Sequence, residues 1–320
     1  MKKNTKRALI AVAALAVVFL VGPRAEINTQ VKTFDLPPDL DQYLSESESR
    51  YPDIRPGAEK TIIWARADKS KTPLSIVYLH GFSATRQETA PLSDELAAEL
   101  DANLFYTRLS GHGRSSEAMA EPTVNDWFND AVEAFEIGKR LGDKVIVIGA
   151  STGGTLATWL AEQPDGDEVL AYILLSPNYA PRDSKAGILT WPWAEQVFVP
   201  LIQGPEYSFT PSSAAHAENW THTYPSSALV TMMGMVKYVR ESDLAGIEKP
   251  VLIIYSPNDT VVNSEQTEQI YEQIGSEIRS IQPVIDDQHE DNHVLAGDIL
   301  APNMTQKVKE IILNFISELE

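Results

Sequence analysis

Cysteine is absent from the 320 residues of the chain. A disulfide framework, a thiolate nucleophile and a cysteine-based metal site are therefore excluded. The absence is compatible with an oxidising compartment but does not require one. His216 and His222 have no metal-like spacing with acidic residues, so we expect neither a metal site nor a cofactor.

Basic residues are scarce. The chain has 26 Lys and Arg against 45 Asp and Glu, which gives a formal charge of −19. The first 25 residues hold five of the basic residues and none of the acidic ones, so the remainder has 21 against 45, a charge of −24. A body this acidic repels nucleic acid and anionic headgroups. We therefore expect no nucleic-acid partner.

One long apolar run occurs, from Ala8 to Gly22, and the basic stretch KKNTKR precedes it. This pattern is typical of a signal segment, although no good cleavage site follows and a membrane span needs roughly 20 apolar residues. We interpret residues 1–25 as a signal anchor, which we favour, or a cleaved signal peptide, with a buried core helix as the third alternative. The N-terminal segment is expected to contact the membrane. Because the basic residues come first, the body is expected on the periplasmic side, anchored to the inner membrane or exported.

Alternating strands and helices follow a polar, proline-bearing stretch, residues 26–59, which we interpret as a linker with a lead-in helix. Apolar runs predict strands at 61–65, 74–79, 104–106, 145–149, 169–175, 251–255 and 281–285. Helical spacing is found at 91–100, 124–141, 265–274 and 304–319, with Asn125 a plausible N-cap for the second of these. Such alternation predicts a mostly parallel sheet with helices on both faces. Residues 180–243 lack strand rhythm and are interpreted as an insertion.

The central stretch of this pattern is Lys144–Leu160, with the sequence KVIVIGASTGGTLATWL. A buried strand leads into G-x-S-x-G and then into helix-forming residues, the context in which a serine lies on a sharp, strained turn. Glycine is needed on either side because a Cβ there would clash with the following helix. Ser151 is therefore a candidate nucleophile, which would need a base to remove its proton.

Other reactive side chains follow the ends of other predicted strands. His80 follows the strand at 74–79, Asp259 follows the strand at 251–255, and His289 and His293 follow the strand at 281–285. Sites in open parallel sheets form outside the carboxyl ends of the strands. The sequence therefore predicts that these groups and Ser151 converge at one edge of the sheet.

These motifs together resemble those of the α/β-hydrolases, in particular the serine hydrolases related to monoacylglycerol lipases and S33-type peptidases. The shared features are the His80-Gly81 turn, the G-H-G-x-S loop at 111–115, the Ser151 turn, Asp259 before two valines, and a late histidine. The resemblance covers about residues 60–320. It implies an α/β-hydrolase fold with an eight-stranded, mostly parallel sheet and a helical cap insertion at about 180–243.

The resemblance also implies a catalytic triad. Ser151 would be the nucleophile, His293 the general base, and Asp259 the group that orients the imidazole. We prefer His293 to His289 because Asn292-His293-Val294-Leu295 runs into a short apolar segment, as the histidine of the family does.

Further roles follow from the same motifs. The main-chain N–H groups of Phe82 and Thr152 would form the oxyanion hole. His112 either faces the substrate pocket or braces the oxyanion loop, and we favour bracing. Aromatic residues of the insertion are candidates for an apolar acyl pocket, although most of them are expected to pack the cap onto the sheet. The substrate-binding candidates are His112, Trp191, Trp193 and Trp220.

The expected activity is hydrolysis of a small-molecule carboxylic ester through an acyl-Ser151 intermediate. An apolar cap and a membrane anchor favour a lipid-like or medium-chain acyl group, with a monoacylglycerol as one candidate. An S33-like aminopeptidase or amide hydrolase is the alternative enzyme. A catalytically silent binding module is the alternative outside enzymes. The sequence leaves the oligomeric state open.

Overall fold

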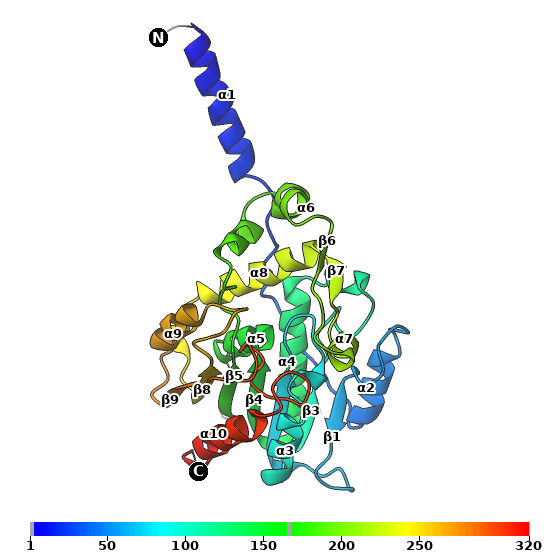
Figure 1. Cartoon of the computed structure of the whole chain (residues 1–320). Helices are drawn as coiled ribbons and strands as arrows, with labels where there is room; N and C mark the ends of the chain where they lie inside the picture. The colour runs from blue at the N-terminus through cyan, green and yellow to red at the C-terminus, as the bar shows by residue number, and fades with distance from the viewer. Residues whose placement is uncertain (1–2, 165–167, 320) are drawn as a thin grey trace.

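The computed structural model describes residues 3–164 and 168–319 (Figure 1). Residues 1 and 2, which belong to the predicted signal segment, lie outside the described residues, as do 165–167 and 320. The described chain forms a main sheet of seven strands rather than the eight we expected, in the order β1-β3-β2-β4-β5-β8-β9. The strands are β1 (Thr61–Ile63), β2 (Thr72–Leu79), β3 (Asn103–Tyr106), β4 (Gly142–Ala150), β5 (Val169–Leu175), β8 (Val251–Tyr255) and β9 (Arg279–Pro283).

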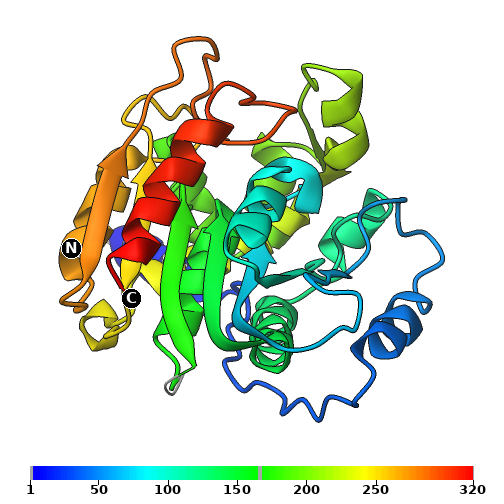
Figure 2. The same ribbon diagram turned by 90° about the horizontal axis from the view of Figure 1, so that it is seen from below.

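The sheet is parallel except at one edge, where β1 runs antiparallel to β3. Helices cover both of its faces, as Figure 2 shows from below. One face carries α3 (Leu92–Glu99) and α10 (Thr305–Ser317), and the apolar core on the other face includes side chains of α2 (Leu40–Glu48), α4 (Val124–Leu141), α5 (Thr152–Ala161) and α9 (Ser264–Gln273). The layered architecture expected from the sequence is confirmed.

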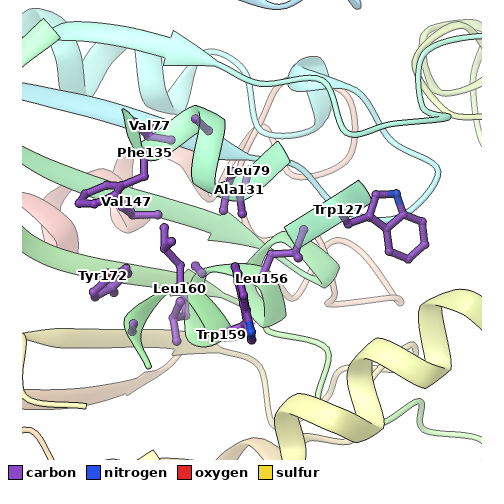
Figure 3. Close-up of a cluster of buried hydrophobic side chains, with 14 of the residues drawn as sticks. Val77, Leu79, Trp127, Ala131, Phe135, Val147, Leu156, Trp159, Leu160 and Tyr172 are labelled. Atoms are coloured by element: carbon purple, nitrogen blue, oxygen red, sulfur yellow. The ribbon is translucent and has the colours of Figure 1, made fainter. Parts of the chain in front are cut away.

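The two cores arise from the alternation of side chains along each strand. In β4, Val145 and Val147 face the core beside α4 and α5, whereas Ile146 and Ile148 face the core beside α3 and α10. All four are fully buried, which explains why the strand is apolar throughout. Figure 3 shows the first of these cores, where Leu156 and Leu160 of α5 lie among the strand side chains of β2 and β4.

Helix α4 has the predicted bounds but a different N-cap. The cap is Thr123, whose side chain accepts a hydrogen bond from the Asp126 N–H, while the Asp126 carboxylate accepts one from the Thr123 N–H. This is a capping box with Asp in place of Glu or Gln. Our assignment of Asn125 was wrong because Asn125 already lies in the first turn, where it donates to the carbonyl groups of Asn28 and Gln30.

The insertion segment, residues 176–250, joins β5 to β8 and lies beyond the ends of the strands (Figure 1). Its longest helix is α8 (Ser227–Arg240), and it also contains α6 (Val199–Ile202) and α7 (Ala214–Asn219). We did not predict the small antiparallel pair of β6 (Glu206–Ser208) and β7 (Thr223–Pro225). Each strand has only three residues, too few for an alternating pattern to be detected.

Helix α1 (Lys3–Leu20) projects from the body and approaches it at the insertion segment (Figure 1). The Trp193 main-chain N–H donates to the Pro23 carbonyl at 2.8 Å, and its indole N–H donates to the Val18 carbonyl at 3.0 Å. The Phe19 ring meets the Trp191 ring edge-on. Within residues 3–164 and 168–319, no helix has both the length and the apolar composition that crossing a membrane requires.

Candidate active site

Ser151 lies at the tip of a strained turn between β4 and α5. Its φ of 50° and ψ of −115° fall outside the usual regions for a residue with a side chain. The turn is tight on both sides: a Cβ at Gly149 would stand 2.4 Å from the Gly153 carbonyl oxygen, and one at Gly153 would stand 2.0 Å from the Leu79 carbonyl oxygen. The predicted clash with the following helix is confirmed at Gly149. At Gly153, which lies in that helix, the clash is instead with the end of β2.

Asp259 follows β8 and is 1% exposed. Its Oδ1 accepts hydrogen bonds from the Val261 and Val262 N–H groups, each at 2.8 Å. Its Oδ2 lies 2.8 Å from Nδ1 of His293. The carboxylate is thus held by the main chain on one side and faces the imidazole with the other.

The His293 ring links Asp259 to Ser151, because its Nε2 lies 3.0 Å from the Ser151 Oγ. With Nδ1–H donating to Asp259, Nε2 is free to accept the serine proton. Burial is the largest single effect and lowers the pKa of His293. The charge and hydrogen bond of Asp259, together with the charges of Glu88 and Asp291, outweigh it, so the net pKa lies above its ordinary value. The structure thus brings together the three side chains that the sequence predicted.

The rival histidine, His289, lies in a separate pair. Its Nδ1 lies 2.6 Å from Oδ2 of Asp286, and its side chain is 38% exposed. Asn292 separates the two histidines and anchors the loop: its Oδ1 accepts from the Asp286 N–H, and its Nδ2 donates to the Asp286 and His289 carbonyl groups. We did not predict this role, although an Asn is one of the few residue types that tolerates its φ of 51°.

The main-chain N–H groups of Phe82 and Thr152 belong to the turns that follow β2 and β4. These two strands are neighbours, with Leu79 opposite Gly149, so the turns lie side by side. Within the described parts of the chain, neither N–H donates a hydrogen bond to a protein acceptor. Two free donors on adjacent turns can stabilise a negatively charged oxygen.

His80 and His112 are fully buried. They lie beside the turn that follows β2 and carries Phe82, which we call the Phe82 turn. His80 accepts a hydrogen bond from the Leu109 N–H at its Nε2, and burial lowers its pKa to about 4, which keeps it neutral. The ring of His112 packs against those of His80, Phe82 and Trp127. This position agrees with the bracing role that we favoured for His112.

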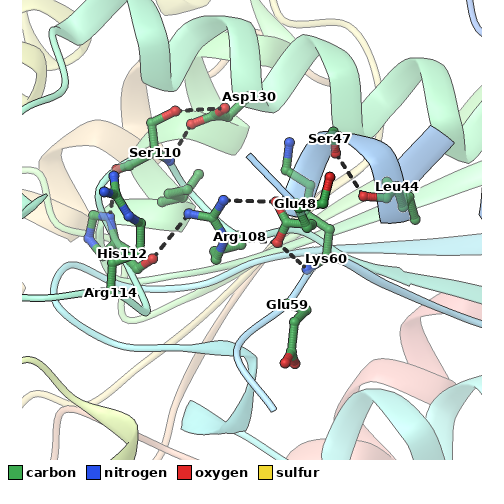
Figure 4. A network of polar contacts seen from close by, with 12 residues as sticks. Leu44, Ser47, Glu48, Glu59, Lys60, Arg108, Ser110, His112, Arg114 and Asp130 are labelled. Carbon is green, nitrogen blue, oxygen red and sulfur yellow. Dashed lines mark hydrogen bonds and ion pairs between the residues drawn. The ribbon is translucent and has the colours of Figure 1, made fainter. Parts of the chain in front are cut away.

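A buried polar network holds the loop that carries His112 (Figure 4). Arg108 pairs with Glu48 of α2 at 2.8 Å and donates to the His112 carbonyl at 3.2 Å, while the Ser110 N–H donates to Asp130 at 2.6 Å. The lead-in helix that we expected within residues 26–59 is therefore α2, which packs into the body and supports the site.

A small cavity lies beside Ser151 and His293. Its volume is about 10 Å³, the space of about one water molecule. The lining residues are Glu88, Thr89, Ala150, Ser151, Leu175, His293, Val294 and Leu295. The sequence did not single out Glu88, because no strand end or motif marks it. Within residues 3–164 and 168–319, no group of three or more His, Asp or Glu side chains is arranged to hold a metal ion.

The three tryptophans predicted to contact substrate lie elsewhere, none of them in the lining of this cavity. Trp191 and Trp193 contact α1 and the residues that follow it. Trp220 is 6% exposed and packs edge-on against the His216 ring. Their role as substrate contacts stays a prediction.

In amino-acid sequence the chain is similar to a known lipase. The thermostable monoacylglycerol lipase of Bacillus sp. (strain H-257) is 35% identical over 94 residues, which cover 29% of this chain and 37% of that relative. The alignment thus spans little more than a third of the relative's length.

Solved structures resemble this one over most of its length. A chain from a study of LipS and LipT, two metagenome-derived lipolytic enzymes, has a TM-score of 0.68 at 24% identity and covers 83% of this chain and 99% of its own. A soluble variant of monoglyceride lipase from Saccharomyces cerevisiae has a TM-score of 0.63 at 15% identity, with 82% and 91% covered. At these identities the likeness shows the fold, that of the α/β-hydrolases.

The model of the family described as serine aminopeptidase, S33, matches residues 70–290, more than half of the chain. This match covers Ser151 and Asp259 and ends just before His293. The chain belongs to this family of α/β-hydrolases.

Proposed function

We propose that the protein is a serine hydrolase that cleaves carboxylic esters through an acyl intermediate on Ser151. The observation that carries the proposal is the chain of hydrogen bonds from Asp259 through His293 to Ser151, with distances of 2.8 and 3.0 Å. The free N–H groups of Phe82 and Thr152 support it.

In the proposed reaction, Nε2 of His293 takes the Ser151 proton as Oγ attacks the ester carbonyl carbon. The carbonyl oxygen becomes negatively charged and accepts hydrogen bonds from Phe82 and Thr152. Asp259 stabilises the imidazolium without taking its proton. The imidazolium then protonates the leaving alcohol as the C–O bond breaks. Water, activated by His293, releases the acid and restores Ser151.

An ester substrate is favoured over a peptide with a free N-terminus. Recognition of a free ammonium group would need an accessible carboxylate close to Ser151. The acid that lines the cavity beside Ser151 is Glu88, which is 3% exposed and already accepts a hydrogen bond from the Gly81 N–H. The lipolytic names of the relatives support a lipid-like or medium-chain acyl group, with a monoacylglycerol as one candidate.

We also propose that the N-terminal segment places the protein at the inner membrane with its body on the periplasmic side, or directs its export. The apolar run behind a basic stretch supports this. Cell fractionation and the intact mass of the mature protein test this proposal. A chain that starts at Met1 and is found in the cytosol would contradict both the membrane-anchored and the exported form.

Labelling with a fluorophosphonate tests the proposed mechanism. The wild type should be labelled at Ser151, Ser151→Ala should not be labelled, and His293→Ala should be labelled far more slowly. His289→Ala is the matched control and should react like the wild type. An unlabelled wild type, or a labelled Ser151→Ala variant, would contradict the proposal.

A series of aryl esters of increasing chain length, measured beside aminoacyl anilides, tests the substrate class. We expect faster turnover of the esters, with an optimum at medium chain length. Faster turnover of the anilides would favour the aminopeptidase alternative instead.

A further inference from the structure

Glu88 is a buried carboxyl group next to the candidate triad. It ends the short helix η1 (Arg86–Glu88), seven residues after the turn that follows β2. Its Oε2 accepts a hydrogen bond from the Gly81 N–H at 2.7 Å and one from the Tyr78 hydroxyl at 3.1 Å. The carboxyl group therefore ties the end of β2 to the Phe82 turn.

Gly81 is held at both of its peptide groups. Its N–H is bound by Glu88, and its carbonyl oxygen lies 2.9 Å from Nδ1 of His80, which donates because its Nε2 accepts from Leu109. The carbonyl of Gly81 and the N–H of Phe82 belong to one planar peptide unit. Hydrogen bonds on both sides of Gly81, to Glu88 and to His80, therefore fix the direction of the Phe82 N–H.

Glycine at position 81 is what lets the carboxyl group approach. A Cβ on that residue would stand 2.4 Å from the Glu88 Oε1. Any side chain at position 81 would push the Glu88 carboxyl group away and break its hydrogen bond with the N–H of residue 81. The hydrogen bond between the Gly81 N–H and Glu88 therefore requires glycine at position 81.

Glu88 also shares the small cavity with Ser151 and His293. Its charge adds to those of Asp259 and Asp291 in raising the pKa of His293, against the effect of burial. Burial raises the pKa of Glu88 itself to about 7, while its hydrogen bonds with Gly81 and Tyr78 and the nearby His293 act in the opposite direction.

We propose that Glu88 is a positioning residue of the hydrolytic site, a proposal that rests on the proposed function. Its carboxyl group holds the turn that presents the Phe82 N–H to the developing oxyanion. When it is ionised, its charge acts on His293 together with that of Asp259. Among the described residues, its carboxyl group is hydrogen-bonded by Gly81 and Tyr78 and not by Ser151 or His293. Glu88 therefore acts through the Phe82 turn and the His293 ring.

The test compares Glu88→Ala with Glu88→Gln in the full-length protein. Alanine removes the acceptor for the Gly81 N–H, so kcat should fall on the order of 10²-fold, the usual cost of losing one oxyanion donor, with KM changed less than about threefold. Glutamine keeps an acceptor oxygen but removes the charge. It should recover most of kcat and move the acid limb of kcat/KM to lower pH.

Gln87→Ala is the matched control on the same turn and should keep the wild-type kcat and pH profile. A folded Glu88→Ala variant with wild-type kcat, or one in which KM alone changes, would overturn the positioning role. If Glu88→Ala does not fold, Glu88→Gln provides the test. The proposal is overturned if Glu88→Gln keeps the wild-type kcat and the acid limb of its kcat/KM profile does not move. Absence of Ser151 labelling in the wild type would instead overturn the proposed function, and this proposal with it.

Discussion

Gly153 lies so close to the carbonyl group of Leu79 that a Cβ on residue 153 would stand 2.0 Å from the Leu79 oxygen. Leu79 is the last residue of β2, and Gly153 is in the first turn of α5. The turn that carries Phe82 and the turn that carries Ser151 and Thr152 are therefore packed against each other through main-chain atoms. This contact sets the spacing between Ser151 and the Phe82 N–H, one of the two candidate oxyanion donors.

Substitution of Gly153 should therefore damage the site directly. Gly153→Ala forces α5 away from β2, and we expect fluorophosphonate labelling to slow by at least about tenfold, since small displacements of reacting groups cost about this much or more. Labelling rate and thermal unfolding measure the effect. Gly187→Ala is the matched control, because a Cβ there meets no atom within 4 Å; equal labelling of the two variants would contradict the steric argument.

Asp259→Asn should reverse the tautomer of His293. Oδ1 accepts from two N–H groups, so the asparagine oxygen takes that place and its NH₂ faces Nδ1. The proton must then move to Nε2, which can no longer accept from Ser151. We expect kcat to fall by about 10⁴-fold, as in trypsin-type triads with the same change. Asp286→Asn, in the pair with His289, is the control and should change kcat less than about threefold.

The raised pKa of His293 predicts the acid limb of the pH profile. Burial lowers this pKa, but the charge and hydrogen bond of Asp259 and the charges of Glu88 and Asp291 together raise it by more. The protonated ring cannot accept the serine proton, so activity is absent at low pH and appears as pH rises through the pKa. The midpoint of kcat/KM should lie above the ordinary imidazole value of about 6.5. A midpoint below that value would show that burial outweighs Asp259, Glu88 and Asp291 together.

The ion pair of Glu48 with Arg108 should contribute far more to stability than pairs at the surface. Both side chains are at least 91% buried, and Glu48 also accepts from the Lys60 N–H. Glu48→Ala leaves the Arg108 charge buried without its partner, and the free energy of unfolding should fall by about 3–5 kcal/mol. Urea denaturation measures the change.

Arg66→Ala is the control for this comparison, since it removes one partner of the exposed pair with Asp101. It should cost less than about 1 kcal/mol. An equal decrease in the free energy of unfolding in the two variants would mean that burial does not strengthen the contribution of the Glu48–Arg108 pair to stability.

Gly22 provides a test of the contact between the N-terminal segment and the insertion segment. A Cβ on Gly22 would stand 2.0 Å from the Trp193 indole nitrogen, so Gly22→Val should disrupt the hydrogen bonds of Trp193 with Val18 and Pro23. Limited proteolysis should then cleave residues 184–202 faster than in the wild type. Gly246→Val is the control for a glycine in open surroundings outside this region, since a Cβ there meets no atom within 4 Å. Unchanged cleavage of Gly22→Val would show that the contact does not protect residues 184–202.

The sequence predicted the elements around the site well, because each depends on a strong local pattern. Buried parallel strands are apolar throughout, so β5 and β8 have the predicted bounds. The strained turn at Ser151 was predicted because glycines mark it on both sides. The convergence of Ser151, Asp259 and His293 followed from their positions after strand ends.

What the sequence did not reveal depends on contacts between distant segments. Glu88 has no local signature, because its partners Gly81 and Tyr78 are recognised only once the turn has folded. Glu48 looks like a solvated residue of a polar stretch until Arg108 is placed beside it. The positions of Trp191 and Trp193 depend on the path of the N-terminal segment, which no periodicity encodes.

The candidate base is residue 293 of 320, and it pairs with a serine 142 positions earlier. Synthesis runs from the N-terminus, so the nucleophile and both oxyanion turns leave the ribosome long before the group that activates them. A nascent chain with its first five strands in place would carry an unactivated serine. Ser151 could therefore be activated only after residue 293 has been made and has folded against it.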